Sequence, residues 1–344
     1  MPGPKPTRRL PVDPFITALL CTVGLALLLP ARGAAAPAVS DAAVGAVGLL
    51  FFLYGARLSA REALDGLRQW RLHGLVLAVT FALFPLLGVA SRVFVPTLLP
   101  QQLYQGLLFL CLLPSTVQSS IAFTSIARGN TAAAVCSATF SSLFGIVVTP
   151  LLAALLLSTH GGGIGAGSVL GIVEQLLLPF LAGQLLRRWI IGVLTRHRRI
   201  LGLVDRGSIL LVVYSAFSEA VVGGVWGQVS LPRLGVLALL EAALLAVVLT
   251  STTLLARRLG FDRPDRTAIV FCGSKKSLAA GVPMATVLFP GPSLGLIVLP
   301  LMLFHQLQLM VCAVLARRWG AAAAAEEPGP APVAADQSLE PASG

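Results

Sequence analysis

The chain has 344 residues, of which 56% are hydrophobic and only 11% are charged, and its mean hydropathy is +0.87. Because a soluble domain carries roughly 25% charged residues, this composition excludes an ordinary soluble fold and predicts an all-α polytopic membrane protein. The net charge of +11 would suit nucleic-acid binding, but the placement of the basic residues explains the charge by membrane topology, and we expect no nucleic-acid partner.

Ten apolar segments follow one another, each long enough for a helix to span a hydrocarbon core of about 30 Å. The first has features of a signal peptide, but we expect a retained helix, because the span count and the repeat described below need it. After a membrane domain of residues 1–319, the polar residues 320–344 are expected to form a disordered cytoplasmic tail. The ten segments cover residues 12–30, 40–57, 73–93, 103–127, 131–158, 168–190, 206–225, 232–256, 266–288 and 292–316.

Basic residues are distributed unevenly among the connections between these segments. If the N-terminus is cytoplasmic, twenty of the 25 basic residues lie in inner connections, and only Arg32, Arg92 and Arg233 lie in outer ones. Basic residues concentrate on the cytoplasmic side of membranes. The pattern therefore predicts a multi-pass protein of the plasma (inner) membrane with both termini cytoplasmic.

An eight-residue pattern occurs twice, 150 residues apart. The sequence GIVVTPLL of residues 145–152 returns as GLIVLPLM at residues 295–302. Five spans precede the second half, so the two halves have opposite orientations, which indicates an inverted-topology repeat. The segment before each copy is interrupted by polar residues, and paired discontinuous helices are typical of the binding site of a secondary transporter.

Few residue patterns point to covalent chemistry. The five cysteines lie in apolar segments without CxxC spacing, and the four histidines form no metal-binding motif. A P-loop, a GxGxxG motif and a nucleophile–base pair are also missing from the sequence. We therefore predict neither an enzyme nor a cofactor, and we assign no metal site.

The most unusual stretch is residues 262–289, DRPDRTAIVFCGSKKSLAAGVPMATVLF. Its apolar interior contains two adjacent lysines, Lys275 and Lys276, and a lysine at mid-depth in a bilayer costs roughly 2.5–3.5 kcal/mol. Such residues normally face a cavity or a partner on a functional path, although lysines near a helix end can instead extend to the membrane surface. We interpret residues 272–277 as a break in a membrane helix that carries a site.

A second interruption lies in residues 112–120, LLPSTVQSS. Hydroxyl and amide groups crowd it, at Ser115, Thr116, Gln118, Ser119 and Ser120, and the next span adds others. Freed carbonyls and hydroxyls can hold a small cation, and half-helix N-termini attract anions. The alternative is that these hydroxyls only bind neighbouring carbonyls or allow close helix packing.

The sequences PSTVQSSIAFTSIARGNTAAAVCSATFSSLFGIVVTPLL and CGSKKSLAAGVPMA together resemble the bile acid:sodium symporter superfamily, and most closely its SBF-like branch. The resemblance covers nearly the whole chain up to Trp319. It implies ten transmembrane helices in two inverted five-helix repeats, with helices 4 and 9 discontinuous and crossing. It also implies a panel of helices 1, 2, 6 and 7 and a core of helices 3–5 and 8–10.

The chain departs from this family at the expected sodium ligands. Counted from Arg266, a ligating glutamate and glutamine of sodium-coupled relatives fall at Phe271 and Lys275, and a third-helix glutamine falls at Thr80. The lost carboxylate and the added ammonium argue against sodium coupling, because a positive charge repels the ion. Other sodium-ligand positions of the family fall near Ser119 and Ser120 and, counted from Asn130, at Ala134 and Ala138.

Carboxylates that would neutralise the lysines are scarce. Glu174, Glu219 and Glu241 are the glutamates inside the predicted spans, and any of them would serve as a counter-ion. His305 in the last span is either a hydrogen-bonded structural residue or part of the same cavity. The full set of candidate binding residues is Thr80, Gln118, Ser119, Ser120, Asn130, Ser137, Thr139, Glu241, Cys272, Gly273, Ser274, Lys275, Lys276, Ser277 and His305.

These observations predict a secondary transporter that moves an organic anion across the bilayer by alternating access. We expect an ammonium, first that of Lys275 and second that of Lys276, to occupy the place of a coupling sodium ion. A sodium-dependent organic anion symporter is the first alternative, and a transporter-like regulator or sensor without flux is the second. The sequence does not indicate an oligomeric state.

Overall fold

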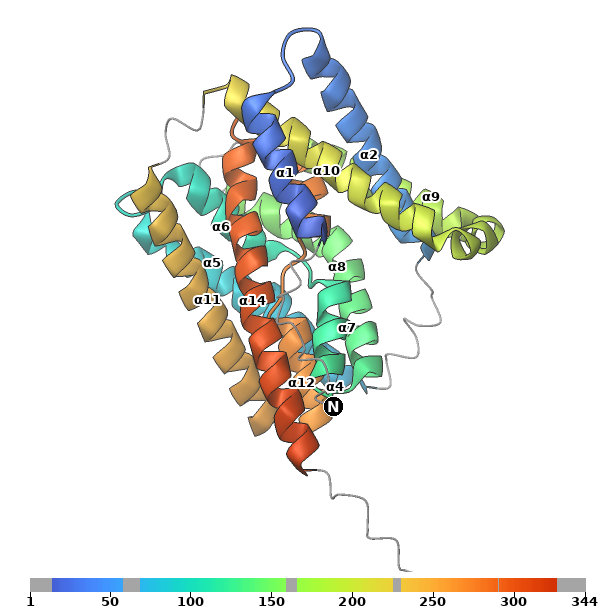
Figure 1. Ribbon diagram of the computed structural model, residues 1–344, viewed down its shortest axis with the longest axis vertical. Coiled ribbons are helices and arrows are strands. Elements are labelled where there is room, and N and C mark those ends of the chain that lie inside the picture. The colour runs from blue at the N-terminus through green and yellow to red at the C-terminus, as the bar shows by residue number, and fades with distance from the viewer. Residues whose placement is uncertain (1–13, 58–68, 159–165, 225–229, 290, 327–344) are drawn as a thin grey trace, which may run out of the picture.

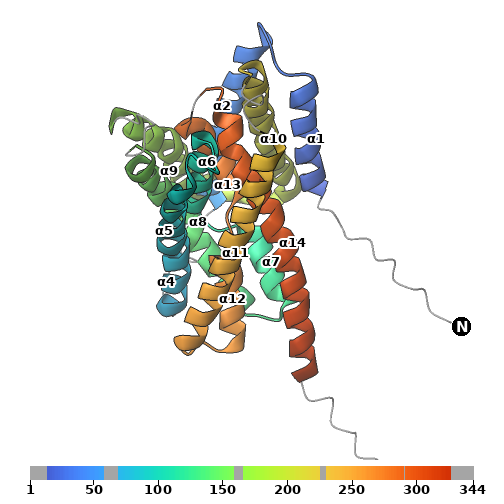
Figure 2. The same ribbon diagram turned by 90° about the vertical axis from the view of Figure 1, so that its left-hand side faces the viewer.

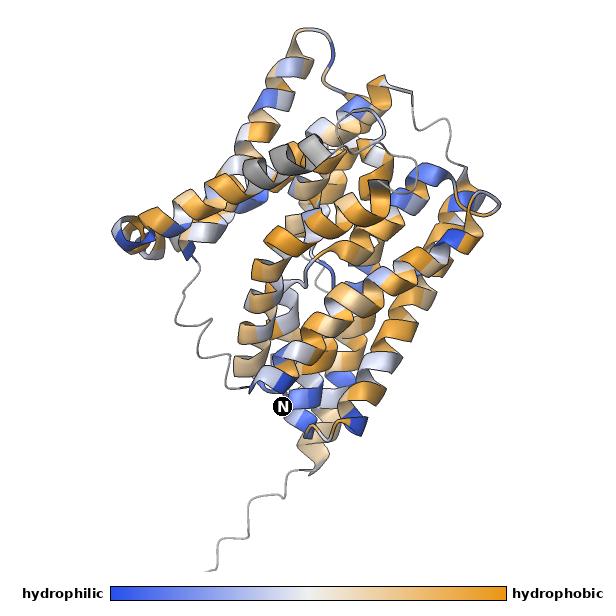
Figure 3. Ribbon diagram, turned by 180° about the vertical axis from the view of Figure 1, so that it is seen from behind, coloured by the Kyte–Doolittle hydropathy of each residue, from blue (hydrophilic) through white to orange (hydrophobic). Residues whose placement is uncertain are grey.

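The computed structural model describes residues 14–57, 69–158, 166–224, 230–289 and 291–326, and these residues form helices and short connections without a strand. Figure 3 shows hydrophobic residues along most of the helices. Within the described residues, seven helices are long and apolar enough to cross a membrane, or eight if one bent pair is a single span. The protein is therefore a multi-pass helical membrane protein, as its composition predicted.

Four helices pack together at one end of the molecule (Figures 1 and 2). The contacts of α2 with α9 and α10, and of α1 with α10, hold this group together. It comprises α1 (Pro14–Leu28), α2 (Ala35–Arg57), α9 (Ala166–Arg196) and α10 (Arg198–Val222).

The remaining helices form a second group that contains both interrupted segments. Its first part is α4 (Trp70–Ala78), the π-helical turn η2 (Val79–Leu83), α5 (Phe84–Ala90), η3 (Ser91–Phe94), α6 (Gln101–Leu112), α7 (Val117–Ile126) and α8 (Thr131–Ser158). Its second part is α11 (Leu231–Arg258), α12 (Arg263–Gly273), α13 (Leu278–Leu288) and α14 (Leu294–Glu326).

The predicted segments correspond to these helices with shifted ends. The first lies at α1, and residues 103–127 and 266–288 are each divided into two helices. The last helix continues to Glu326, beyond residue 319, where we expected the membrane domain to end. The run of five alanines from Ala321 to Ala325 explains the extension, because alanine has the highest helix propensity. Residues 327–344 of the expected tail lie outside the described residues.

Helices α2 and α9 approach each other closely at two glycines. A β-carbon added at Gly55 would collide with the carbonyl oxygen of Phe180, and one added at Gly183 would collide with that of Phe52. Small residues allow such close helix crossings in membranes, where dispersion contacts between helices replace the hydrophobic effect.

We expect Gly183→Ala to lower the free energy of unfolding by roughly 1–3 kcal/mol, because the new methyl group forces the two backbones apart. Gly192→Ala in the same helix is the matched control, since nothing lies within 4 Å of a β-carbon there. Thermal unfolding of the purified proteins measures both effects. Equal melting temperatures for the two variants would contradict the close crossing.

Candidate functional site

Two helix breaks lie against each other in the second group of helices. Helices α6 and α7 are bent by 63° across residues 113–116, and α12 and α13 are separated by residues 274–277. The backbone N–H of Ser277 donates to the carbonyl of Pro114 at 2.9 Å, so the breaks are in direct contact.

The amino-acid sequence explains each interruption. Pro114 has no N–H and disfavours helical geometry at Leu113, whose ψ is 155°. At the second break, Ser277 has an extended backbone, and its hydroxyl accepts the N–H of Ala280 at 3.2 Å as the N-cap of α13. Both breaks therefore have local causes that do not depend on a bound ligand.

Hydroxyl groups in the first break and in the first turn of α7 donate to carbonyl groups at the end of α12 and in the second break. The Ser120 hydroxyl donates to the carbonyl of Phe271 at 3.0 Å, and the Thr116 hydroxyl donates to that of Lys276 at 2.9 Å. The Ser115 hydroxyl donates in the same way to the carbonyl of Cys272. These bonds satisfy carbonyls that the end of α12 leaves without an intrahelical donor.

The side chain of Lys276 donates hydrogen bonds in the opposite direction, to carbonyls at the first break and in η2. Its ammonium donates to three carbonyls, those of Thr80 at 2.9 Å, Cys111 at 2.9 Å and Leu113 at 2.7 Å. The side chain is completely buried, and its nitrogen lies 4.1 Å from the centre of the Phe84 ring. An ammonium has three protons to donate, and here all three have a carbonyl partner.

The carbonyl of Thr80 is available because of the π-helical turn η2. The N–H of Phe84 donates to Val79, five residues earlier, instead of to Thr80. The donor at the same spacing from Thr80 would be Pro85, which has no N–H. Turns of this kind often occur at functional sites, and this one leaves a carbonyl that only an outside donor can satisfy.

The carbonyls of the first break are also satisfied from outside the helix. The N–H of Ser115, which would continue the helix from Cys111, donates instead to the Ser141 hydroxyl at 2.9 Å. The carbonyl of Leu112 accepts the Thr149 hydroxyl at 2.7 Å. Lys276 therefore meets carbonyls that the bend in the chain has set free.

Lys275 has different surroundings, although it is equally buried. Its nitrogen lies 3.7 Å from the centre of the Phe123 ring and 5.5 Å from that of Phe271, and it has no hydrogen-bond partner among the described residues. The Phe271 ring packs in turn against Trp319, with 5.4 Å between ring centres. Aromatic faces attract a cation, but they supply no acceptor for its protons.

Gln308 of α14 fixes the backbone of Lys276 from the opposite side. Its side-chain oxygen accepts the N–H of Lys276 at 2.8 Å, and its nitrogen donates to the carbonyl of Lys276 at 2.8 Å. The same nitrogen lies 3.0 Å from Nδ1 of His305, which is also buried. We expected Gln308 beside His305 as a possible lining residue of the cavity, but its pairing with Lys276, 32 residues earlier, follows only from the folded chain.

We expect Gln308→Leu to lower the free energy of unfolding by roughly 1–3 kcal/mol, because the buried N–H of Lys276 loses its acceptor. Gln306→Leu is the matched control in the same helix, since Gln306 is only partly buried. Thermal unfolding in detergent measures the difference. An equal effect of both substitutions would show that the contacts of Gln308 with Lys276 add nothing specific.

The structure places the other predicted residues in three kinds of environment. Ser120, Cys272 and Ser277 contact the opposite break or its supporting helices, and the Cys272 thiol lies 3.6 Å from the carbonyl of Ala134. The Ser119 hydroxyl and the Thr80 hydroxyl are buried without a partner among the described residues. Gln118 is exposed, Thr139 is partly buried, and Gly273 is buried, with a methyl group of Val79 3.3 Å from the position that an added β-carbon would take.

Three predicted residues serve local structure. Asn130 donates to the carboxylate of Asp265 at 2.7 Å and accepts the N–H of Ala133 at 2.9 Å, so it links α8 to the start of α12. The Ser274 hydroxyl donates to Val270 within α12 at 2.6 Å. Ser137 lies 2.7 Å from Nδ1 of His73, a residue that we had not singled out.

Glu241 is completely buried, and neither of its carboxylate oxygens has a hydrogen-bond partner among the described residues. It forms no ion pair with Lys275 or Lys276. Carbonyl groups and aromatic rings surround the two ammonium groups instead of the carboxylate that we expected. The side chain of Glu174 lies outside the described residues.

Comparison with known proteins completes the description of the site. The sequence profile of the SBF-like CPA transporter family matches residues 13–321. The uncharacterized protein PA2026 of Pseudomonas aeruginosa is 55% identical over 92% of this chain and 97% of its own length, and the putative symporter YfeH of Escherichia coli is 51% identical over 90% and 93%. Sodium/bile acid cotransporter 7 of Danio rerio is 28% identical over 88% of this chain and 91% of its own length.

Proposed function

The chain belongs to the SBF-like CPA transporter family, and from this premise we propose that it moves an organic anion by alternating access without a coupling sodium ion. The observation that carries the proposal is the contact of the Lys276 ammonium with three carbonyls from two separate helical segments. The ammonium of Lys276 lies where a bound cation would otherwise be needed to bind these three carbonyls.

Carbonyl oxygens that converge on one point are suitable ligands for a hard cation. One of the three belongs to Thr80, the position at which the family resemblance expects a sodium-ligating glutamine. Lys276 supplies the charge and satisfies the oxygens at once, so it takes the role that we had first given to Lys275. An ammonium bound to these carbonyls leaves no requirement for sodium at this position.

We assign to Lys275 the recognition of the transported anion. Its ammonium is buried, lies against aromatic rings and has no acceptor among the described residues. The nearby start of α13 at Leu278 adds N–H groups and the positive end of a helix dipole. A carboxylate or sulfate would therefore find both a charge and donors. If Lys275 stays charged, transport is uniport or exchange, and if it loses its proton during the cycle, transport is coupled to protons.

The proposed architecture has ten spans in two inverted repeats, with α6–α7 as helix 4 and α12–α13 as helix 9. Helices α1, α2, α9 and α10 would form the panel, and the other group would form the core that moves against it. The packing of α2 against α9 and α10 is more extensive than any contact between the two groups, and this supports the division. Both termini would be cytoplasmic in the plasma membrane, and reporters fused after Thr159 and Arg318 should signal outside and inside respectively.

The proposed substrate is a small amphipathic organic anion, and the bilayer is the other expected partner. Named relatives include a sodium/bile acid cotransporter and a putative symporter, which supports transport rather than enzyme activity. Cholate is therefore a reasonable first probe, followed by aromatic carboxylates and sulfated steroids.

Uptake into proteoliposomes tests the proposal. Purified protein is first screened for thermal stabilisation by the anions, and each stabilising anion is then tested in counterflow, in which an unlabelled internal anion drives entry of the labelled one. Accumulation above that of protein-free liposomes is expected. Stabilisation by an anion that never enters the liposomes would favour a regulator or sensor over a transporter.

A further inference from the structure

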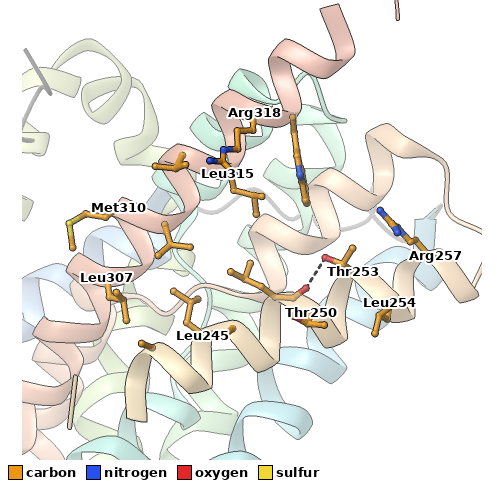
Figure 4. A pocket seen from close by; sticks show the side chains of 15 residues that line it. Leu245, Thr250, Thr253, Leu254, Arg257, Leu307, Met310, Leu315 and Arg318 are labelled. Atoms are coloured by element: carbon orange, nitrogen blue, oxygen red, sulfur yellow. Dashed lines mark hydrogen bonds between the residues drawn. The ribbon is translucent and has the colours of Figure 1, made fainter. Parts of the chain in front are cut away.

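A groove runs between α11 and α14, and the residues whose carbonyls bind the Lys276 ammonium do not line it. It encloses about 880 Å³, and most of its lining side chains are apolar. Figure 4 shows Leu245 and Leu254 of α11 and Leu307 and Met310 of α14 along the space between the two helices. Leu254, Met310 and Val314 are exposed, so the groove is open toward the surroundings of the helices.

The groove is one membrane leaflet deep. Its lining residues on α11 extend from Ala242 to Arg257, which at about 1.5 Å per residue corresponds to roughly 22 Å. Half of a bilayer of about 40–45 Å, headgroup regions included, measures about 20–22 Å. The groove therefore extends from near the middle of the bilayer to the headgroup level.

The headgroup end of the groove is positively charged. Arg257 and Arg318 line it from the two helices, together with Trp319, and neither arginine forms an ion pair within the described part of the chain. The Trp319 ring packs against the Phe271 ring, and the carbonyl of Trp319 accepts a hydrogen bond from Arg263 at 2.6 Å. Tryptophan and arginine at the end of a membrane helix are typical of the interface with lipid headgroups.

We propose that this groove binds one anionic phospholipid, with its headgroup at the basic end that Arg257 and Arg318 line and its acyl chains along α11 and α14. Two guanidinium groups from different helices can hold a phosphate through charge-assisted hydrogen bonds. Basic pockets between membrane helices bind anionic lipid headgroups in this way. The open apolar side favours a lipid over a small soluble anion, because acyl chains can occupy the apolar lining and a small soluble anion has no apolar part to do so.

Lipid titrations of the purified protein test the site. Phosphatidylglycerol and phosphatidylcholine with the same acyl chains are added in neutral detergent, and bound lipid is counted by native mass spectrometry while the melting temperature is followed. We expect phosphatidylglycerol to bind with saturation and raise the melting temperature, and phosphatidylcholine to do neither. Equal effects of the two lipids would overturn the assignment.

Two pairs of arginines provide a matched comparison. The double variant Arg257→Gln and Arg318→Gln should weaken binding of phosphatidylglycerol at least tenfold. The control, Arg258→Gln and Arg317→Gln, removes the same charge from adjacent exposed residues that do not line the groove, and should bind as the unmodified protein does. An equal loss in both would indicate diffuse attraction to a basic surface and would contradict a specific site.

A second comparison tests the acyl-chain part of the groove without changing charge. Ala246→Trp places a large ring in the lining, whereas Ala243→Trp places it on an exposed position of the same helix that does not line the groove. Only the first should reduce bound phosphatidylglycerol. If sn-glycerol 3-phosphate stabilised the protein as well as phosphatidylglycerol, or if cholate displaced the lipid one for one, the groove would be a site for soluble anions and the proposal would fail.

Discussion

Replacing Lys276 by methionine should prevent the protein from accumulating in a folded form. The substitution keeps an unbranched side chain of similar length but removes the donor to the carbonyls of Thr80, Cys111 and Leu113. Each buried carbonyl left unpaired costs roughly 1–3 kcal/mol, so the three together cost about 3–9 kcal/mol. A typical protein has a total stability of about 5–15 kcal/mol, and most of it would be lost.

Fluorescence-detected size-exclusion chromatography of a tagged protein measures the folded yield. Lys275→Met is the matched control, because it removes an equally buried ammonium from the adjacent residue. A folded yield for Lys276→Met equal to that of the control would contradict the role that we assign to the three carbonyl contacts.

Lys275→Gln should reduce or abolish transport while leaving the fold intact. The ammonium of Lys275 has no hydrogen-bond acceptor among the described residues, so its removal breaks no bond and relieves the burial of an unpaired charge. The melting temperature should therefore stay constant or rise. Binding of an anion that relies on this charge should weaken by roughly 1.5–3 kcal/mol, which corresponds to at least about a tenfold loss.

Counterflow uptake in proteoliposomes, at equal amounts of folded protein, measures the loss for whichever anion the unmodified protein transports. Lys275→Arg keeps the charge and should retain part of the activity. Uptake by Lys275→Gln at the unmodified rate would exclude Lys275 from anion recognition. A fall in melting temperature as large as that caused by Gln308→Leu would mean that Lys275 is structural.

The positions of the two breaks could be predicted because their causes are local. Pro114 cannot continue a helix, and adjacent lysines inside an apolar segment need special surroundings. The different surroundings of Lys275 and Lys276 could not be predicted. Residues 274–277 have no helical periodicity from which the directions of the side chains would follow. Only the folded chain shows that one ammonium meets carbonyls and the other meets aromatic rings.

The partners of Lys275 and Lys276 from distant parts of the chain could not be predicted either. The expected counter-ion was a carboxylate, since glutamates are the obvious charged groups in the spans, yet Glu241 contacts neither lysine. The actual partners are backbone carbonyls, which every residue possesses and which no sequence pattern marks. Thr80 is no exception, because the missing N–H of Pro85 would free the carbonyl of Phe81, four residues earlier, and only the π-helical turn η2 leaves the carbonyl of Thr80 free.

Thermal unfolding in sodium chloride, potassium chloride and choline chloride at equal ionic strength tests the central claim most directly, and it requires no known substrate. A ligand present at 100 times its dissociation constant stabilises the folded state by about 2.7 kcal/mol, so a bound sodium ion would be visible. If Lys276 occupies the place of the ion, the melting temperature will be the same in all three salts. A saturable rise specific to sodium would contradict the account and would support a sodium-coupled symporter.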